Sequence, residues 1–120
     1  MNPKIALVFG GSRGIGAACV QALAADGFRV AYTTTSAAPK SSGEGVRAYT
    51  ADIRDASQVA KVFADVQADF GARPDCVLAN AGINVPPGPM AQFDPARFRD
   101  LVEVNIVGAF NILAEAARQV

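Results

Sequence analysis

The sequence predicts an α/β fold in three layers, a doubly wound parallel sheet with helices on both of its faces. Short apolar runs alternate along the chain with segments of helical periodicity, which is the pattern of βαβ units. A glycine-rich segment separates the first apolar run from the first helical segment, as a tight strand-to-helix turn requires. The chain has 120 residues, of which 51% are hydrophobic, so one domain can bury a core.

The expected strands are short and rich in apolar or β-branched residues, and they cover 4–9, 29–34, 46–51 and 76–79. Only 35–45 connects the second strand to the third. This connection contains Pro39 with several glycines and serines, and it is near the lower length limit for a parallel crossover. We therefore expect an irregular loop there in place of a helix.

Three helices are expected. The first covers 14–25, and its buried stripe is predicted to contain Ile15, Cys19, Val20, Leu23 and Ala24. The second follows Asp55 as N-cap, with Gln58 in the capping-box position, and Gly71 ends it. Its apolar face is predicted to comprise Val59, Val62, Phe63, Val66 and Phe70. The third begins at Asp94-Pro95, continues to the chain end and is apolar over most of its circumference.

Composition excludes several classes of function. The formal net charge is zero, so there is no electrostatic argument for binding nucleic acid or a membrane surface. Histidine is absent, which excludes a histidine base or ligand, and no metal site is expected. Cys19 and Cys76 lie in apolar segments and are interpreted as small buried hydrophobes of a reducing compartment. No apolar stretch is long enough for a signal peptide core or a membrane span, so we expect a cytoplasmic protein.

The glycine-rich segment 10–16 reads GGSRGIG and lies between a predicted strand and a predicted helix. Glycines allow a tight turn and let backbone approach a pyrophosphate, and the helix start then offers N–H groups to that anion. The context therefore predicts a dinucleotide-phosphate site. The candidate cofactor-binding residues here are Gly10, Ser12, Arg13, Gly14, Ile15 and Gly16. A glycine-rich turn that binds nothing is the alternative.

This G-x-x-x-G-x-G spacing resembles that of the short-chain dehydrogenase/reductase family, although Phe9 stands where the family usually has Thr. The resemblance implies a Rossmann-type sheet and a hydride-transferring activity. Asp52-Ile53 resembles the family's Asp-Val pair, which implies that Asp52 bonds the adenine amino group and that Ile53 lines its pocket. An ordinary strand-end turn is the alternative for this pair.

Two further segments carry the resemblance. The segment 79–82 reads Ala-Asn-Ala-Gly and is similar to the family's Asn-Asn-Ala-Gly, which implies that Asn80, Ala81 and Gly82 border the cofactor. Asn80 is expected to bond backbone of a neighbouring strand, unless the segment is only a plain turn. Asn105 stands in Val-Asn-Ile where the family has Val-Asn-Leu, which implies a catalytic role in holding a water between the catalytic Lys and solvent. A surface or capping Asn is the alternative. The matches extend over essentially the whole chain.

The end of the second strand predicts the cofactor. An acid about 20 residues beyond the glycine loop selects NAD, but this segment carries Thr34 and Thr35 and no acid. Hydroxyls can donate to a 2′-phosphate, and Arg13 supplies a cation suited to it. We therefore expect NADP(H). Strand and turn composition alone is the alternative for the threonines.

The family's chemistry also needs a Ser and a Tyr-x-x-x-Lys pair. Neither tyrosine fits, because Ser36 follows Tyr32 and Ile53 follows Tyr49 at the Lys position. Residues 1–120 are therefore expected to be the N-terminal half of an NADP-binding reductase domain, most similar to 3-oxoacyl-[acyl-carrier-protein] reductases. The parent enzyme would reduce a small-molecule or acyl-thioester ketone and form a homo-oligomer through the final helix. A catalytically inert nucleotide-binding or assembly module is the alternative.

Overall fold

The computed structural model describes residues 3–37 and 45–119, so most of the expected loop between the second and third strands lies outside the described residues. The elements follow in the order β1 (Ile5–Phe9), α1 (Gly14–Ala25), β2 (Arg29–Thr34), β3 (Val46–Thr50), α2 (Ala56–Phe70), β4 (Cys76–Ala79), a 3-10 turn (Met90–Gln92), α3 (Pro95–Val102), a π-helical segment (Glu103–Gly108) and α4 (Ala109–Arg118).

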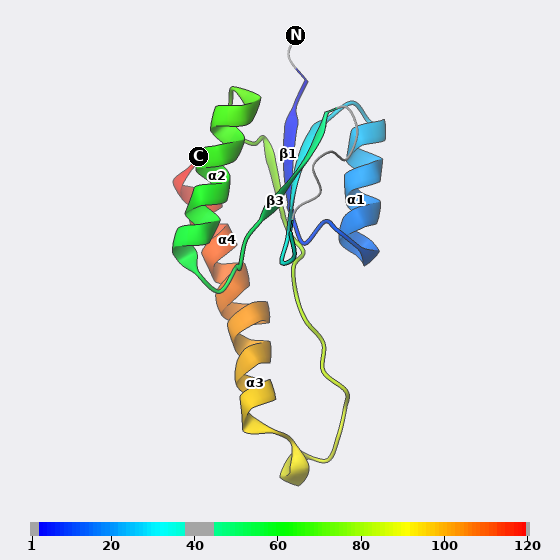
Figure 1. The fold of residues 1–120 in the computed structure, drawn as a ribbon, viewed down its shortest axis with the longest axis vertical. Coiled ribbons are helices and arrows are strands. Elements are labelled where there is room, and N and C mark those ends of the chain that lie inside the picture. The colour runs from blue at the N-terminus through cyan, green and yellow to red at the C-terminus, as the bar shows by residue number, and fades with distance from the viewer. Residues whose placement is uncertain (1–2, 38–44, 120) are drawn as a thin grey trace.

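The four strands form one parallel sheet in the order β3-β2-β1-β4 (Figure 1). Leu7 at the centre of β1 lies opposite Ala31 of β2 on one side and Val77 of β4 on the other. The chain places β2 and β3 on one side of β1 and then places β4 on the other side. The point at which the strand order reverses therefore lies between β1 and β4. In sheets of this kind ligands bind at that point, outside the carboxyl ends of the strands.

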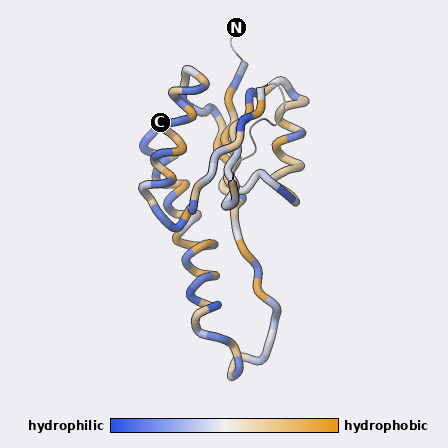
Figure 2. The backbone as a smooth tube through the Cα atoms, in the orientation of Figure 1, coloured by the Kyte–Doolittle hydropathy of each residue, from blue (hydrophilic) through white to orange (hydrophobic). Residues whose placement is uncertain are grey.

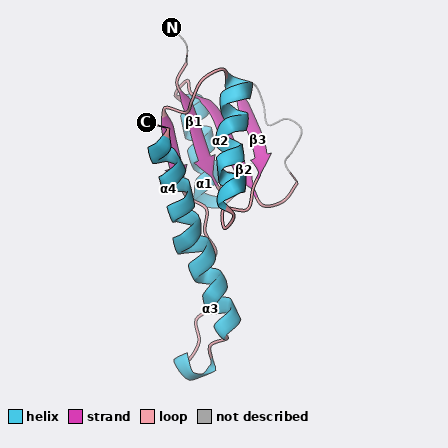
Figure 3. Cartoon of the chain, turned by 90° about the vertical axis from the view of Figure 1, so that its left-hand side faces the viewer, coloured by secondary structure: helices cyan, strands magenta, loops and turns pink. Residues whose placement is uncertain are grey.

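Helices cover both faces of the sheet, which confirms the three predicted layers. Figure 3 shows α2 and α4 on one face and α1 on the other. Alternate residues of β1 point to opposite faces. Leu7 and Phe9 pack on the α2 and α4 side with Phe63 and Ile112, whereas Val8 packs on the other side with Val20 of α1. Two hydrophobic clusters therefore hold the layers together.

Helix α2 buries the complete face that its periodicity predicts, and Gly71 ends it in the left-handed conformation at φ +81°. Asp55 caps it by accepting a hydrogen bond from the Ser57 N–H at 2.9 Å. The predicted capping box is wrong, because the Asp55 N–H already donates to the Asp52 carbonyl at 3.1 Å. Gln58 Oε1 instead accepts from the Asp52 N–H at 2.8 Å.

Helix α1 buries less of the predicted stripe. Ile15 is 75% exposed, and only Gly16 and Val20 of the helix are buried, while Cys19 is half-buried. The prediction for Ile15 is wrong because Gly16 is the residue that faces the strand ends. Neighbouring residues in a helix lie about 100° apart around its axis, so Ile15 faces another direction. A side chain at Ile15 therefore points to solvent.

Helices α3 and α4 and the π-helical segment between them form one continuous rod that projects beyond the sheet (Figure 1). Asp94 caps its start by accepting from the Ala96 N–H at 2.9 Å. Figure 2 shows hydrophobic residues along the rod as well as in the sheet. α3 buries none of its residues, and the rod exposes four large apolar side chains, Phe98, Ile106, Phe110 and Leu113. The sequence pattern predicted the helix but not its π-helical turn.

Candidate functional site

A cleft of about 800 Å³ opens at the carboxyl ends of the strands. The glycine loop after β1, the ends of β2 and β3, and the segment after β4 all contribute to its lining. Asp100 and Val104 of the rod line a further side. The topology therefore brings segments that lie far apart in the sequence to one site.

The glycine loop is held in place by three hydrogen bonds to its neighbours. The Gly10 N–H donates to Thr33 Oγ1 at 3.1 Å, and the Gly11 N–H donates to the Thr33 carbonyl at 3.0 Å. Asn80 Nδ2 donates to the Gly10 carbonyl at 3.1 Å. Asn80 thus bonds backbone beside β1, as expected from the sequence, and the loop is tied to both β2 and β4.

Two glycines of this loop have different physical requirements. Gly10 has φ +84°, and a Cβ there would lie 2.7 Å from the Ala81 Cα, so its backbone packs against the segment after β4. Gly16 has an ordinary helical backbone, but a Cβ would lie 1.9 Å from the Gly10 carbonyl oxygen. The start of α1 therefore approaches the loop more closely than any side chain permits.

The exposed part of the loop lines the cleft with Ser12, Arg13 and Gly14. Arg13 is the extended N-cap residue of α1, and its side chain makes no capping hydrogen bond. The first turn of a helix presents backbone N–H groups and the positive end of the dipole, which suits an anion. Ile15 and Gly16 do not line the cleft, since one faces solvent and the other packs beneath the loop.

Hydroxyl groups border the cleft at the end of β2. Thr34 is buried, and its Oγ1 lies 3.1 Å from Ser36 Oγ and accepts from the Ser36 N–H at 3.3 Å. Thr35 is exposed. Both threonines line the cleft, so hydroxyls occupy the position where an acid would be expected in an NAD site.

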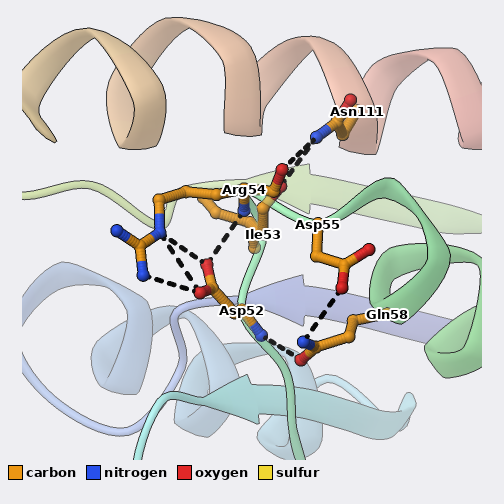
Figure 4. Close-up of polar contacts among 6 residues, drawn as sticks. All are labelled: Asp52, Ile53, Arg54, Asp55, Gln58 and Asn111. Atoms are coloured by element: carbon orange, nitrogen blue, oxygen red, sulfur yellow. Dashed lines mark hydrogen bonds and ion pairs between the residues drawn. The ribbon is translucent and has the colours of Figure 1, made fainter. Parts of the chain in front are cut away.

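The turn after β3 carries Asp52, Ile53 and Arg54 into the cleft (Figure 4). Arg54 Nε and Nη2 donate to the Asp52 carboxylate at 3.0 and 2.8 Å, and the Arg54 N–H donates to Asp52 Oδ1 at 3.0 Å. Ile53 is buried and packs against Gly108, where a Cβ would lie 2.6 Å from its Cδ1. The turn thus presents the Asp52–Arg54 pair to the cleft, while the Ile53 side chain packs in the core.

The hydrogen bonds from the Arg54 side chain are the main cause that lowers the pKa of the Asp52 carboxyl, and partial burial opposes them. In return, Asp52 raises the pKa of Arg54, and the charges of Asp100 and Glu103 add to that effect. Asp52 is therefore a carboxylate at neutral pH, an acceptor that can take a hydrogen bond from a ligand.

Ala81 and Gly82 continue the lining after β4, together with Asn80. Asn105 lies in the π-helical segment and is exposed, and it does not line the cleft. Its Oδ1 accepts from the Ile83 N–H and its Nδ2 donates to the Ile83 carbonyl, both at 2.8 Å. Both polar groups of the Asn105 amide therefore hold the segment that follows Gly82.

Several residues that sequence reasoning did not select also shape the site. Thr33, Arg54 and Gln58 line the cleft. Asn111 of α4 does not line it, but its Nδ2 donates to the carbonyls of Ile53 and Arg54 at 2.9 and 3.3 Å. An arginine two residues after an acid was a signal for the Asp52 pair. Nothing in the sequence pattern marked Asn111, because its partners are backbone atoms 57 and 58 residues away.

The described residues contain no helix long and apolar enough to cross a membrane. Within 3–37 and 45–119, His, Cys, Asp and Glu side chains form no group of three or more that could hold a metal ion.

The family model for short chain dehydrogenases matches residues 4–120. The chain is 35% identical over 113 residues to the 3-oxoacyl-[acyl-carrier-protein] reductase MabA of Mycobacterium tuberculosis, covering 93% of this chain and 43% of that protein. A solved short-chain dehydrogenase/reductase from Serratia marcescens is 36% identical with a TM-score of 0.83, covering 97% of this chain and 52% of that one.

The 3-ketoacyl-(acyl-carrier-protein) reductase from Brucella melitensis, solved as a complex with NADH, is 25% identical with a TM-score of 0.90. The match covers 97% of this chain and 50% of that one. The chain thus spans about half the length of the curated relatives it matches. The glycine loop, the order of the strands and the family match agree with one another. The chain therefore belongs to the short-chain dehydrogenase family of oxidoreductases.

Proposed function

We propose that the cleft binds NADP(H), and that residues 1–120 are the N-terminal, cofactor-binding half of a reductase that acts on a ketone of the 3-oxoacyl thioester class. The observation that carries the cofactor proposal is the meeting of Arg13, Thr34 and Thr35 at one cleft. An arginine and hydroxyls suit a 2′-phosphate, and there is no carboxylate at the end of β2 to repel it.

The glycine loop fits the rest of the cofactor. The loop packs closely on the start of α1, since a Cβ at Gly16 would lie 1.9 Å from the Gly10 carbonyl oxygen. At its glycines the loop therefore presents backbone atoms to the cleft. Gly10, Gly14 and Gly82 add no side chain to the lining of the cleft. The bound cofactor would supply the hydride, while this chain binds the phosphates and orients the adenosine.

Proton transfer to the substrate needs a group that the family resemblance assigns to Tyr-x-x-x-Lys, and residues 1–120 contain no such pair. We therefore expect the 120-residue chain by itself to oxidise NADPH with acetoacetyl thioesters at the uncatalysed rate. A Tyr-x-x-x-Lys segment encoded directly downstream would favour the reductase. A stop codon followed by non-coding sequence would favour the second candidate, a catalytically inert nucleotide-binding or assembly module.

The rod supports a homo-oligomer as the assembled form. Phe98, Ile106, Phe110 and Leu113 are each more than half exposed, and large exposed apolar patches mark interfaces. Within the described residues β4 pairs only with β1, so the outer edge of β4 is also open to association. The two half-buried free thiols support a cytoplasmic, reducing compartment.

Isothermal titration of the chain with NADPH and with NADH tests the cofactor proposal. We expect tighter NADPH binding, and we expect Arg13→Ala to weaken NADPH by about 1.5–3 kcal/mol while changing NADH little, because one charge-assisted hydrogen bond to phosphate is lost. Arg97→Ala is the matched control, since Arg97 is exposed and does not line the cleft. Equal affinities for the two cofactors would refute the preference.

A further inference from the structure

The two arginines that line the cleft are in different states. The side chain of Arg13 has no hydrogen bond or ion pair to any of the described residues, so it is available to a phosphate. Arg54 is committed to Asp52, because its Nε and Nη2 donate to the two carboxylate oxygens at 3.0 and 2.8 Å. A guanidinium fork engaged in this way is not the cation for the 2′-phosphate. Arg54 therefore needs another explanation.

The backbone of the turn that carries this pair is already held from three sides (Figure 4). Gln58 of α2 accepts from the Asp52 N–H at 2.8 Å, and Asn111 of α4 donates to the carbonyls of Ile53 and Arg54. Ile53 is 6% exposed and packs against Gly108. The main remaining freedom in the turn is the rotation of the half-buried Asp52 side chain and of the exposed Arg54 side chain.

The bonds from Arg54 stop the Asp52 side chain from rotating, but they do not fill every acceptor position of the Asp52 carboxylate. A carboxylate offers about four acceptor positions. Asp52 Oδ1 takes two bonds of 3.0 Å, from Arg54 Nε and from the Arg54 N–H. Oδ2 takes Nη2 at 2.8 Å and a longer, shared contact to Nε at 3.2 Å. One position therefore remains for a neutral N–H donor of a ligand. In NADP(H), the base beside this part of the site offers such a donor in its adenine amino group.

We propose that Arg54 is a positioning residue that holds the Asp52 carboxylate in the orientation that accepts the adenine amino group, and so sets the base specificity of the cofactor site. The inference rests on the proposed NADP(H) function. The turn clamped by Gln58 and Asn111 provides the fixed platform, and the guanidinium fork fixes the plane of the carboxylate. Asp52 contacts the base, and Arg54 acts through Asp52.

The test compares NADP⁺ with its purine analogue, in which a hydrogen atom replaces the adenine amino group and no other ring position changes. Isothermal titration of the wild-type chain should show tenfold or greater preference for NADP⁺, the worth of one hydrogen bond to a charged group. Arg54→Ala should reduce that preference to about threefold or less, because the carboxylate then samples other rotamers. Arg54→Lys should also reduce it, because an ammonium cannot form the planar fork.

Arg47→Ala is the matched control. Arg47 is an exposed arginine on β3 that pairs with Asp69 at 3.6 Å outside the cleft, and its loss should leave the preference unchanged. An unchanged preference in Arg54→Ala would mean that Arg54 does not position Asp52, and an increased preference would mean that Arg54 competes with the base for Asp52. Either result overturns the inference. A wild-type preference in Arg54→Lys would overturn it too, because charge alone would then suffice.

The failure of the inference and the failure of the proposed function give different results. If the wild-type chain binds neither cofactor, the proposed function is wrong and the inference falls with it. If it binds both equally, the cofactor site stands, but Asp52 does not read the base and the inference is wrong.

Discussion

Replacement of Gly16 by Ala tests whether the glycine loop is built as the structure describes. A Cβ at this position would lie 1.9 Å from the Gly10 carbonyl oxygen and 2.7 Å from Asn80 Nδ2. Relief requires a shift of about 1 Å, and the obstacle is backbone that is hydrogen-bonded to Thr33 and Asn80. Overpacking costs about 1–3 kcal/mol, and a rigid obstacle places this case at the upper end. The higher helix propensity of Ala offsets up to about 1 kcal/mol.

We therefore expect Gly16→Ala to lower the free energy of unfolding by about 2 kcal/mol, measured by urea denaturation followed by circular dichroism. Gly88→Ala is the control, because a Cβ there meets no atom within 4 Å, and its effect should stay within about 0.5 kcal/mol. Helix propensity considered alone predicts the opposite sign for Gly16→Ala. A variant as stable as wild type, or more stable, would show that the helix start does not pack against the loop and would refute this reasoning.

Three further predictions concern the charged pair, the rod and the core. Arg54→Ala should raise the pKa of Asp52 toward its ordinary value of 3.8, which a carboxyl-carbon NMR titration measures; an unchanged pKa would mean that the ion pair is absent in solution. Because the pair lowers the folded-state pKa of Asp52, its contribution to stability is present above about pH 4 and is lost as the pH falls through that lowered value, so the variant should lose less stability on acidification. Phe110→Glu should reduce concentration-dependent association in sedimentation equilibrium, since Phe110 is 66% exposed on the rod, and a wild-type chain that stays monomeric at high concentration would contradict the proposed interface. Leu7→Ala should cost about 2–5 kcal/mol of stability in urea denaturation, because Leu7 is fully buried in the central strand, and a loss below about 1 kcal/mol would contradict the assigned core.

The local sequence pattern was sufficient to predict most of the strands and helices of the fold. Each strand was predicted within one residue of its bounds, and the buried face of α2 was predicted completely, because period and burial are coupled in a helix with one face on a sheet. The glycine spacing between β1 and α1 was sufficient to indicate a phosphate site. The observed strand order, β3-β2-β1-β4, is one of the few arrangements of βαβ units that satisfy the connection rules.

Tertiary structure decided which polar groups meet. The capping box at Gln58 was wrong because the Asp55 N–H found a partner in the preceding turn, and the Gln58 amide was then left to hold Asp52. Ile15 was predicted to be buried, but the close packing of its neighbour Gly16 turned it outward. Both errors have one physical cause. Periodicity reports the face of an element, whereas the nearest competing donor, acceptor or backbone atom depends on the three-dimensional arrangement.

The site itself divides in the same way. Sequence alone located the loop, turn and strand ends that carry Arg13, Asp52 and Asn80, because parallel strands bring their carboxyl ends to one edge. It did not reveal that Arg54 occupies both oxygens of Asp52 or that Asn111 reaches the same turn from α4. Hydrogen bonds to side chains two residues away and to backbone more than 50 residues away leave no periodic signal. The local geometry of the turn after β3 determines the Arg54 bonds, and the packing of α4 against that turn determines the Asn111 bonds.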